Sequence, residues 1–505
     1  MTATAPPPVE QFGPAMARLA LGMMRHAGAP NPDAPHIAMY VTPWYRQACG
    51  WFAIAFGIAL AARGGARVSF LINDMPYPAI HPQELDEVAA FETFCRDFEA
   101  MYPYSRLSAY LGAASPDRRA IRDGVVDQTL LLDARHRVGA GTLSPGHRVS
   151  FLRTSHTPLS HIATAVDGYF AKEKPDAIYV PGGVANGSYV VTRLAADHGV
   201  RIASVDSSLG SLFVGSHSIA SQFSELAETY QHLISLPARV SETARAKGFA
   251  ALEQKIAAAP AMDLPPCDLI LPLGYDWDTV ALGVGSLYED QGTWLRDTVS
   301  YVLAKHPSTH IVVRAHPHEL RHPNKDNAIL MDECVARRLP NLHVMRAQDR
   351  IPVYGLLTTA KAVVACQSTV VMEAQMKGVP AIALRDNYYV LAGAVPRPHT
   401  REAYHHWLDQ HLAGPRAQVS EAASAAAALL YFLLESVAKD PTRFTPHADD
   451  FWAWLNNDPV ADLTAPFTAD LVRAIAGDIP LATLKARRTL GLDPVPPGAR
   501  DLVAA

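Results

Sequence analysis

The stretch at residues 362–384, AVVACQSTVVMEAQMKGVPAIAL, decides the fold of this chain. Residues 362–366 are a short apolar run rich in β-branched side chains, which is typical of a strand buried in a parallel sheet. The polar residues 367–369 end that run and carry hydroxyl groups that favour a helix start. We therefore expect a helix over 370–377 and, after a glycine, a strand over 379–384. Strand, helix and strand in this order predict a βαβ unit of a parallel sheet.

The amino end of this expected helix is a candidate phosphate site. Free N–H groups of a first helical turn attract anions, and Gln367, Ser368 and Thr369 stand at that turn. Glu373 lies four residues after Thr369 on the same face, and its carboxylate suits sugar hydroxyls because it only accepts hydrogen bonds. We expect these residues to hold a nucleotide. An ordinary capped helix with a glutamate favoured by the helix dipole is the alternative.

Length and composition favour a folded protein with several domains. The chain has 505 residues, so two or three domains are expected. A net charge of -5 argues against a broad nucleic-acid surface. The five cysteines are scattered without a CxxC pair, which indicates reduced thiols in a cytoplasmic setting. No signal peptide is expected at the start, and the apolar run at residues 50–62 is shorter than the roughly 20 residues of a spanning helix.

Two series of alternating strands and helices flank a proline-rich segment at residues 260–266. The fold class expected is therefore α/β, with an N-terminal Rossmann-like domain at 1–259, a C-terminal Rossmann-like domain at 267–430 and a helical extension at 431–505. The strands are expected at residues 36–41, 67–72, 177–180 and 201–205 in the first series, and at 269–273, 310–314, 342–345, 362–366 and 379–384 in the second.

Other polar side chains follow strands and should meet at the same sheet edge. Arg314 and His316 close the strand at 310–314, and both can donate to phosphate oxygens. Asp278 follows the first strand after the linker and faces the ligand or caps a helix. Tyr388 follows the last strand and covers a ligand or packs between domains. The histidines near 316–322 lack a partner carboxylate or thiol at a recognised spacing, so no metal site and no cofactor are expected.

The order of these motifs resembles the capsule polysaccharide biosynthesis glycosyltransferases, the group that includes bacterial capsule Kdo transferases. The resemblance covers about residues 265–405. In this family Lys-Pro is usual where Arg314-Ala315 stands, and glycine is common at the place of Val371, which leaves the donor sugar open. The matching pieces are Leu271-Pro272-Leu273, Asp278-Thr279, Arg314-Ala315-His316-Pro317, Ser368-Thr369-Val370, Glu373-Ala374, Gly378-Val379-Pro380 and Tyr388-Tyr389.

The resemblance implies a GT-B fold, with two Rossmann-like domains facing a cleft and the nucleotide sugar held mainly by the second. It implies metal-independent transfer from a CMP- or UDP-sugar to a growing capsule-type polysaccharide or its lipid-linked acceptor. The expected location is the cytoplasm, with peripheral contact to the inner membrane or the polysaccharide export machinery. Arg314, His316 and the 367–369 turn would stabilise the leaving phosphate, and Asp206 would act as general base, with Asp74 as second choice.

Both of these aspartates are also candidates for helix caps, so neither assignment as a base is exclusive. Two other functions remain as alternatives. One is a polyol-phosphate transferase of the teichoic-acid type. The other is a non-catalytic nucleotide-sugar-binding subunit of a polysaccharide assembly complex.

Overall fold

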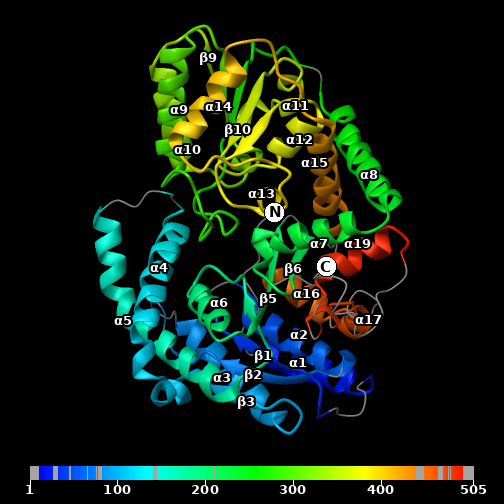
Figure 1. The fold of residues 1–505 in the computed structure, drawn as a ribbon. Coiled ribbons are helices and arrows are strands. Elements are labelled where there is room, and N and C mark those ends of the chain that lie inside the picture. Colours follow the sequence, from blue (N-terminus) through cyan, green and yellow to red (C-terminus); the bar gives the residue numbers. More distant parts are fainter. Residues whose placement is uncertain are drawn as a thin grey trace.

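The structure is a computed structural model with two α/β lobes stacked one above the other (Figure 1). Lobe 1, drawn below, is built mostly from the first half of the chain, and lobe 2, drawn above, mostly from the second half. The residues that it describes are 11–26, 32–44, 47–64, 66–75, 77, 82–139, 141, 145–208, 211–260, 262–438, 448–464, 470–471, 473–475, 477 and 479–492.

Lobe 1 contains a sheet with the strand order β3-β2-β1-β4-β5-β6, parallel except for the last, antiparallel pair. Its inner strands are buried on both faces: Met39 of β1 packs into one core and Tyr40 into the other. Its strands are β1 (His36–Val41), β2 (Arg67–Ile72), β3 (Tyr104–Arg106), β4 (Ala177–Pro181), β5 (Arg201–Ser208) and β6 (Ser211–Gly215).

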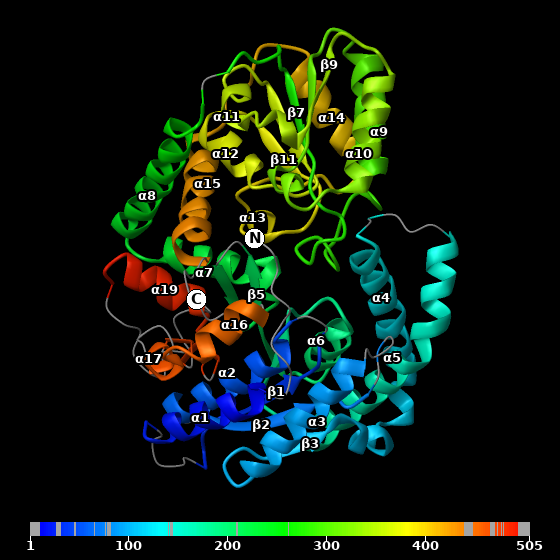
Figure 2. The same ribbon diagram turned by 180° about the vertical axis from the view of Figure 1, so that it is seen from behind.

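Helices cover both faces of this sheet, because the side chains on both faces of its inner strands are apolar and buried. The first three helices pack on one face and the next three on the other (Figure 2). The first face carries α1 (Phe12–Met24), α2 (Cys49–Gly64) and α3 (Pro82–Asp97), and the second carries α4 (Arg119–Val138), α5 (Pro145–Glu173) and α6 (Ser188–Asp197).

Lobe 2 contains an all-parallel sheet with the order β11-β10-β7-β8-β9. Its strands are β7 (Leu269–Pro272), β8 (Ile311–Arg314), β9 (Leu342–Met345), β10 (Ala362–Ala365) and β11 (Ala381–Ala383). Its helices after the linker are α9 (Gln291–Lys305), α10 (Lys325–Ala336), α11 (Val353–Leu356), α12 (Val370–Met376), α13 (Tyr388–Leu391), α14 (Arg401–Leu412) and α15 (Glu421–Leu433). Two Rossmann-like sheets in separate lobes are the predicted α/β, GT-B arrangement, which is thereby confirmed.

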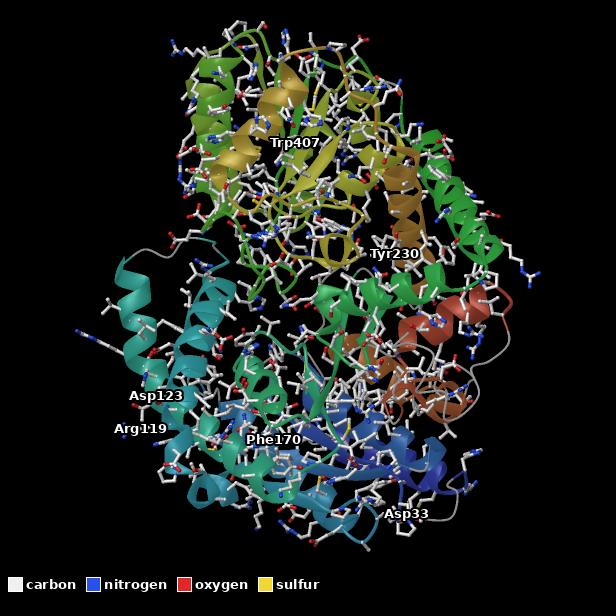
Figure 3. All side chains as sticks on the ribbon, in the orientation of Figure 1. Asp33, Arg119, Asp123, Phe170, Tyr230 and Trp407 are labelled. Carbon is white, nitrogen blue, oxygen red and sulfur yellow. The ribbon has the colours of Figure 1, made fainter. Side chains whose placement is uncertain are left out.

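Packing crosses the predicted domain limits in two places. The helices α7 (Ser224–Ser235) and α8 (Ala238–Ala257) precede residue 259, yet their apolar side chains belong to the core of lobe 2. Tyr230 of α7 lies where this helix meets the lower end of α15 (Figure 3). After α15 the chain returns to lobe 1, where α16 (Ala448–Leu455) and α17 (Pro459–Thr464) pack on α1, and α19 (Leu481–Thr489) joins both cores. The limits 1–259, 267–430 and 431–505 remain a prediction.

The helix α15 and its continuation form a segment, Glu421–Ala438, long and apolar enough to cross a membrane by length and composition. Half of that window is buried inside the protein. The segment packs between α8 and α12, and residues 427–433 have no exposed surface. A core helix that packs on several neighbours has this apolar composition, so the segment is weak evidence for membrane insertion.

The hairpin at the edge of the first sheet was not predicted. The expected strand ended at residue 205, because serines and a glycine follow it. In the structure β5 continues to Ser208 and β6 returns antiparallel to it, with Asp206 opposite Phe213. Asp206 therefore stands inside an edge hairpin rather than in a loop.

Candidate functional site

A cleft lies between the lobes, at the carboxyl ends of strands from both sheets. Its volume is about 670 Å³, within the range of roughly 300–1,000 Å³ that is usual for ligand pockets. Lobe 1 contributes residues after β1 and β4 and from the β5–β6 hairpin, and lobe 2 contributes the loops after β7 and β8. This is the place where open parallel sheets bind ligands.

Carboxylates from both lobes meet one hydroxyl group in this cleft. The Oγ1 atom of Thr279 lies 3.2 Å from Oδ2 of Asp206, across the lobe boundary, and 3.2 Å from Oδ1 of Asp278. All three side chains line the cleft. A hydroxyl carries one proton and can donate it to only one carboxylate at a time. The predicted residues Asp206 and Asp278 are therefore brought together, around a hydroxyl from the neighbouring threonine.

His316 lies in the turn after β8 and also lines the cleft. Its Nδ1 accepts a hydrogen bond from the backbone N–H of His318 at 3.2 Å, which leaves the proton on Nε2. Burial, with the nearby His318 and Arg314, lowers the pKa of His316 to about 4. At neutral pH the ring is uncharged, so His316 can stabilise an anion as a hydrogen-bond donor and not as a cation.

The same turn supplies a basic side to the cleft. His318, Arg321 and His322 line it from lobe 2, and His136 of α4 lines it from lobe 1. Burial is the main cause that lowers the pKa of His318, and the Asp278 carboxylate opposes that shift. Arg321 is exposed at the cleft wall and supplies a permanent positive charge. The sequence analysis did not include Arg321 in the site; its place five residues after His316 was the available signal.

Aromatic rings line the remaining wall of the cleft. They are Trp44 and Phe213 from lobe 1, Phe223 at the start of α7, and Tyr275 and Trp277 from lobe 2. The ring of Tyr275 stacks edge-on against Trp277, with centroids 5.1 Å apart. Flat apolar surfaces beside carboxylates suit sugar rings, which present both C–H faces and hydroxyls.

The residues of the 367–369 turn are not among those that line this cleft. Gln367 and Ser368 are half-buried and Thr369 is exposed. The Oγ atom of Ser368 accepts the N–H of Val370 at 3.3 Å, while Thr369 at the N-cap makes no side-chain cap bond. The backbone N–H of Ser368 donates to Oη of Tyr389 at 3.0 Å. The phosphate role of this turn stays a prediction.

Three further predicted residues point into the core of lobe 2. Glu373 is 4% exposed and accepts a hydrogen bond from Oη of Tyr431 at 3.2 Å, beneath α15, and burial raises its pKa. Arg314 donates to the carbonyl oxygen of Ile351. Tyr388 is buried against the ring of Phe223, which itself lines the cleft. These three are not among the residues that line the cleft, and the donor roles predicted for them remain predictions.

Asp74, the second choice for a base, holds a neighbouring turn. Its Oδ1 accepts the backbone N–H of Ser108 at 3.0 Å, and its Oδ2 accepts the hydroxyl of Ser108 at 2.5 Å. It is not among the lining residues of the cleft.

Across the residues that the structure describes, no group of three or more His, Cys, Asp or Glu side chains is placed to hold a metal ion.

No protein-family model and no curated protein matches the chain. Among solved structures it is similar to KpsC of Thermosulfurimonas dismutans, a beta Kdo 2,4 transferase, with 14% identity, a TM-score of 0.34, and coverage of 51% of this chain and 80% of that one. It is also similar to a putative UDP-N-acetylglucosamine 2-epimerase of Listeria monocytogenes, with 13% identity, a TM-score of 0.26, and coverage of 86% and 98%. A third is the UDP-GlcNAc 2-epimerase of Neisseria meningitidis bound to UDP-GlcNAc, with 12% identity, a TM-score of 0.22, and coverage of 79% and 100%.

The first of these structures is a Kdo transferase, the group that the sequence resembles, and the other two are epimerases of a nucleotide sugar by name.

Proposed function

We propose that this protein is a glycosyltransferase that moves a sugar from a nucleotide-sugar donor to a bacterial surface polysaccharide or its lipid-linked acceptor. The observation that carries the proposal is the pairing of opposite chemistries across one cleft. Asp206 from lobe 1 faces His316, His318 and Arg321 from lobe 2. A transferase needs both: a base for the attacking alcohol and hydrogen-bond donors for the departing phosphate.

The hydroxyl group of Thr279 beside Asp206 indicates where the acceptor hydroxyl would bind. Thr279 places its Oγ1 at 3.2 Å from the Asp206 carboxylate, and a sugar hydroxyl of the same chemistry fits that position once Thr279 turns away. Asp206 then takes the proton as the acceptor oxygen attacks the anomeric carbon of the donor. The aromatic wall beside it gives the acceptor ring a surface to pack on.

The leaving side follows from the turn after β8. The uncharged His316 donates Nε2–H to a phosphate oxygen, and Arg321 contributes a fixed positive charge. Negative charge on the phosphate increases as the bond to the sugar breaks, so these donors stabilise the transition state more than the bound donor. No metal ion takes part in this scheme.

The test compares Asp206→Asn with Asp74→Asn. Binding of CMP, CDP and UDP is measured by calorimetry, and transfer is measured with CMP- and UDP-sugars and polysaccharide fragments as acceptors. We expect Asp206→Asn to bind nucleotide like the wild type and to lose about 10²–10⁴-fold in kcat, the usual contribution of a general base. Asp74→Asn should keep its kcat, because the Asp74 carboxylate is bonded to Ser108.

Three outcomes would contradict the proposal. Turnover of CDP-glycerol alone would indicate the polyol-phosphate transferase. Nucleotide binding that raises the melting temperature without turnover would indicate a non-catalytic binding subunit. Conversion of UDP-GlcNAc to its 2-epimer without any acceptor would indicate an epimerase.

A further inference from the structure

A buried amide, Asn327 on α10, lies behind the cleft and has no exposed surface. Its Nδ2 donates to the carbonyl oxygen of Gly274 at 2.9 Å and to Oε1 of Glu319 at 2.8 Å. Its Oδ1 accepts from Nε2 of Gln291 at 2.6 Å. Both amide protons and the amide oxygen are thus used, so this buried side chain is fully hydrogen-bonded to three different segments of lobe 2.

One end of this network holds the loop after β7. Gly274, the second residue after that strand, has its N–H bonded to Oε1 of Gln291 at 2.6 Å and its carbonyl bonded to Asn327. Nδ2 of Asn324 also donates to that carbonyl at 3.4 Å. Side chains therefore take both backbone groups of Gly274, where a strand partner would normally take them. The loop that starts there carries Asp278 and Thr279 into the cleft.

The other end holds the turn after β8. The same Glu319 Oε1 that accepts from Asn327 also accepts the backbone N–H of His316 at 3.0 Å. Glu319 and Gln291 are 7% and 3% exposed. A chain of buried hydrogen bonds thus runs from His316 through Glu319 and Asn327 to Gly274. When every polar group in such a buried network has a hydrogen-bond partner, the network holds one arrangement of its side chains. Leaving one of these groups without a partner costs stability.

We propose that Asn327 is a positioning residue that fixes the His316 turn and the 274–279 loop relative to each other, so that the phosphate donor and the Asp278–Thr279 pair face the same bound substrate. This inference deepens the proposed function and rests on it for its catalytic consequence. Asn327 touches none of the reacting groups itself: its effect passes through Glu319 to His316 and through Gly274 to the loop.

The test replaces Asn327 by aspartate, which keeps the shape and removes both amide donors. The new carboxylate would face Oε1 of Glu319 and the carbonyl of Gly274, so the network must open. Asn341→Asp is the matched control, because Nδ2 of Asn341 likewise donates to two oxygens, those of Pro307 at 3.0 Å and Thr309 at 2.8 Å, in lobe 2 but away from the cleft. Asn327→Ala serves as a second variant if the aspartate variant does not fold.

Each change is made in the wild type and in the His316→Gln background. We expect Asn327→Asp to lower kcat about 10–100-fold in the wild type, since a displacement near 1 Å costs that much. In the His316→Gln background it should cost clearly less, because the part of the loss that passes through the His316 ring is already gone, while the part that passes through the 274–279 loop remains. Nucleotide affinity should stay within about threefold, and Asn341→Asp should leave kcat unchanged. An equal loss in both backgrounds would overturn the inference.

A second readout separates this inference from the proposed function. The ¹⁵N signals of the His316 ring, assigned by their loss in His316→Gln, report whether the proton is on Nε2. We expect Asn327→Asp, or Asn327→Ala, to shift them while Asn341→Asp does not. Absence of transferase activity in the wild type would refute the proposed function only. Unshifted His316 signals in a folded Asn327 variant would refute the positioning role, whatever the activity.

Discussion

The buried ion pair between Arg385 and Asp276 gives a sharp prediction about the loop that enters the cleft. Nη2 of Arg385 lies 2.6 Å from Oδ1 of Asp276, and the two side chains are only 6% and 11% exposed. Burial is the largest single influence and lowers the pKa of Arg385, but the surrounding acidic groups, with Asp276 first among them, together outweigh it and raise that pKa. Oδ2 of Asp276 also accepts the first backbone N–H of α9, from Gln291, at 2.5 Å.

Asp276→Asn leaves the guanidinium of Arg385 charged and buried without its partner carboxylate. Removing one partner of a buried ion pair costs about 3–5 kcal/mol of stability. Asp332→Asn is the control: that pair, with Arg346, has the similar distance of 2.5 Å, but its side chains are 38% and 70% exposed. An exposed pair contributes about 0–1 kcal/mol.

Urea unfolding of both variants, with tryptophan fluorescence as the signal and a common m-value, measures the difference. The double variant Arg385→Met/Asp276→Leu should recover most of the loss, because it removes the unpaired charge. Equal midpoints for Asp276→Asn and Asp332→Asn would refute the reasoning. A double variant as unstable as Asp276→Asn would show that shape, and not charge, holds the loop.

Two further predictions concern other parts of the chain. The pKa of His316 is about 4 in the folded protein, against an ordinary value of 6.5, so the folded state prefers the uncharged ring. The unfolded chain therefore takes up the proton first as the pH falls. Relative to pH values above 6.5, the folded state loses up to about 3 kcal/mol of stability between pH 6.5 and pH 4. His316→Gln should therefore melt with a weaker pH dependence over that window, and identical melting curves in pH would contradict it. Gly248 of α8 faces the backbone of α15, and a Cβ there would meet the carbonyl oxygen of Ala428 closer than 3.0 Å, so Gly248→Ala should cost at least about 1–3 kcal/mol. Gly124 of α4 has nothing within 4 Å of an added Cβ, so Gly124→Ala should stabilise the protein by about 0.5–1 kcal/mol. A less stable Gly124→Ala variant, or a Gly248→Ala variant as stable as the wild type, would contradict these helix contacts.

Much of the fold follows from local pattern. The β1 run at 36–41 and the β10 run at 362–365 are apolar on both faces, which only a strand covered by helices on both sides accommodates. The rule that parallel strands end at one edge also placed Asp206, Asp278 and His316 correctly in one cleft. For these residues the position along a strand was enough, because the strand carries the side chain to the edge.

Other features depend on contacts that no local pattern encodes. Glu373 was expected to face a ligand because it stands one turn into α12, but α15, some fifty residues later in the chain, covers that face and Tyr431 binds its carboxylate. Arg321 reaches the cleft because the turn after β8 doubles back. Asn327 has the sequence context of an ordinary helix residue, and two of its side-chain hydrogen bonds lead to residues 36 and 53 positions away, Gln291 and Gly274.

The sequence by itself determined two parallel sheets and the strand ends at which polar side chains gather. The apolar pattern that marks a strand or a helix, and the order of these elements along the chain, are properties of each segment alone. Only the tertiary structure decided how these parts share surfaces. It assigned α7 and α8 to lobe 2 and returned the C-terminal helices to lobe 1. It brought the Asp206 carboxylate within reach of Thr279. Each of these depends on which apolar face finds which partner, and that is settled by burial summed over the whole molecule and not by any one stretch.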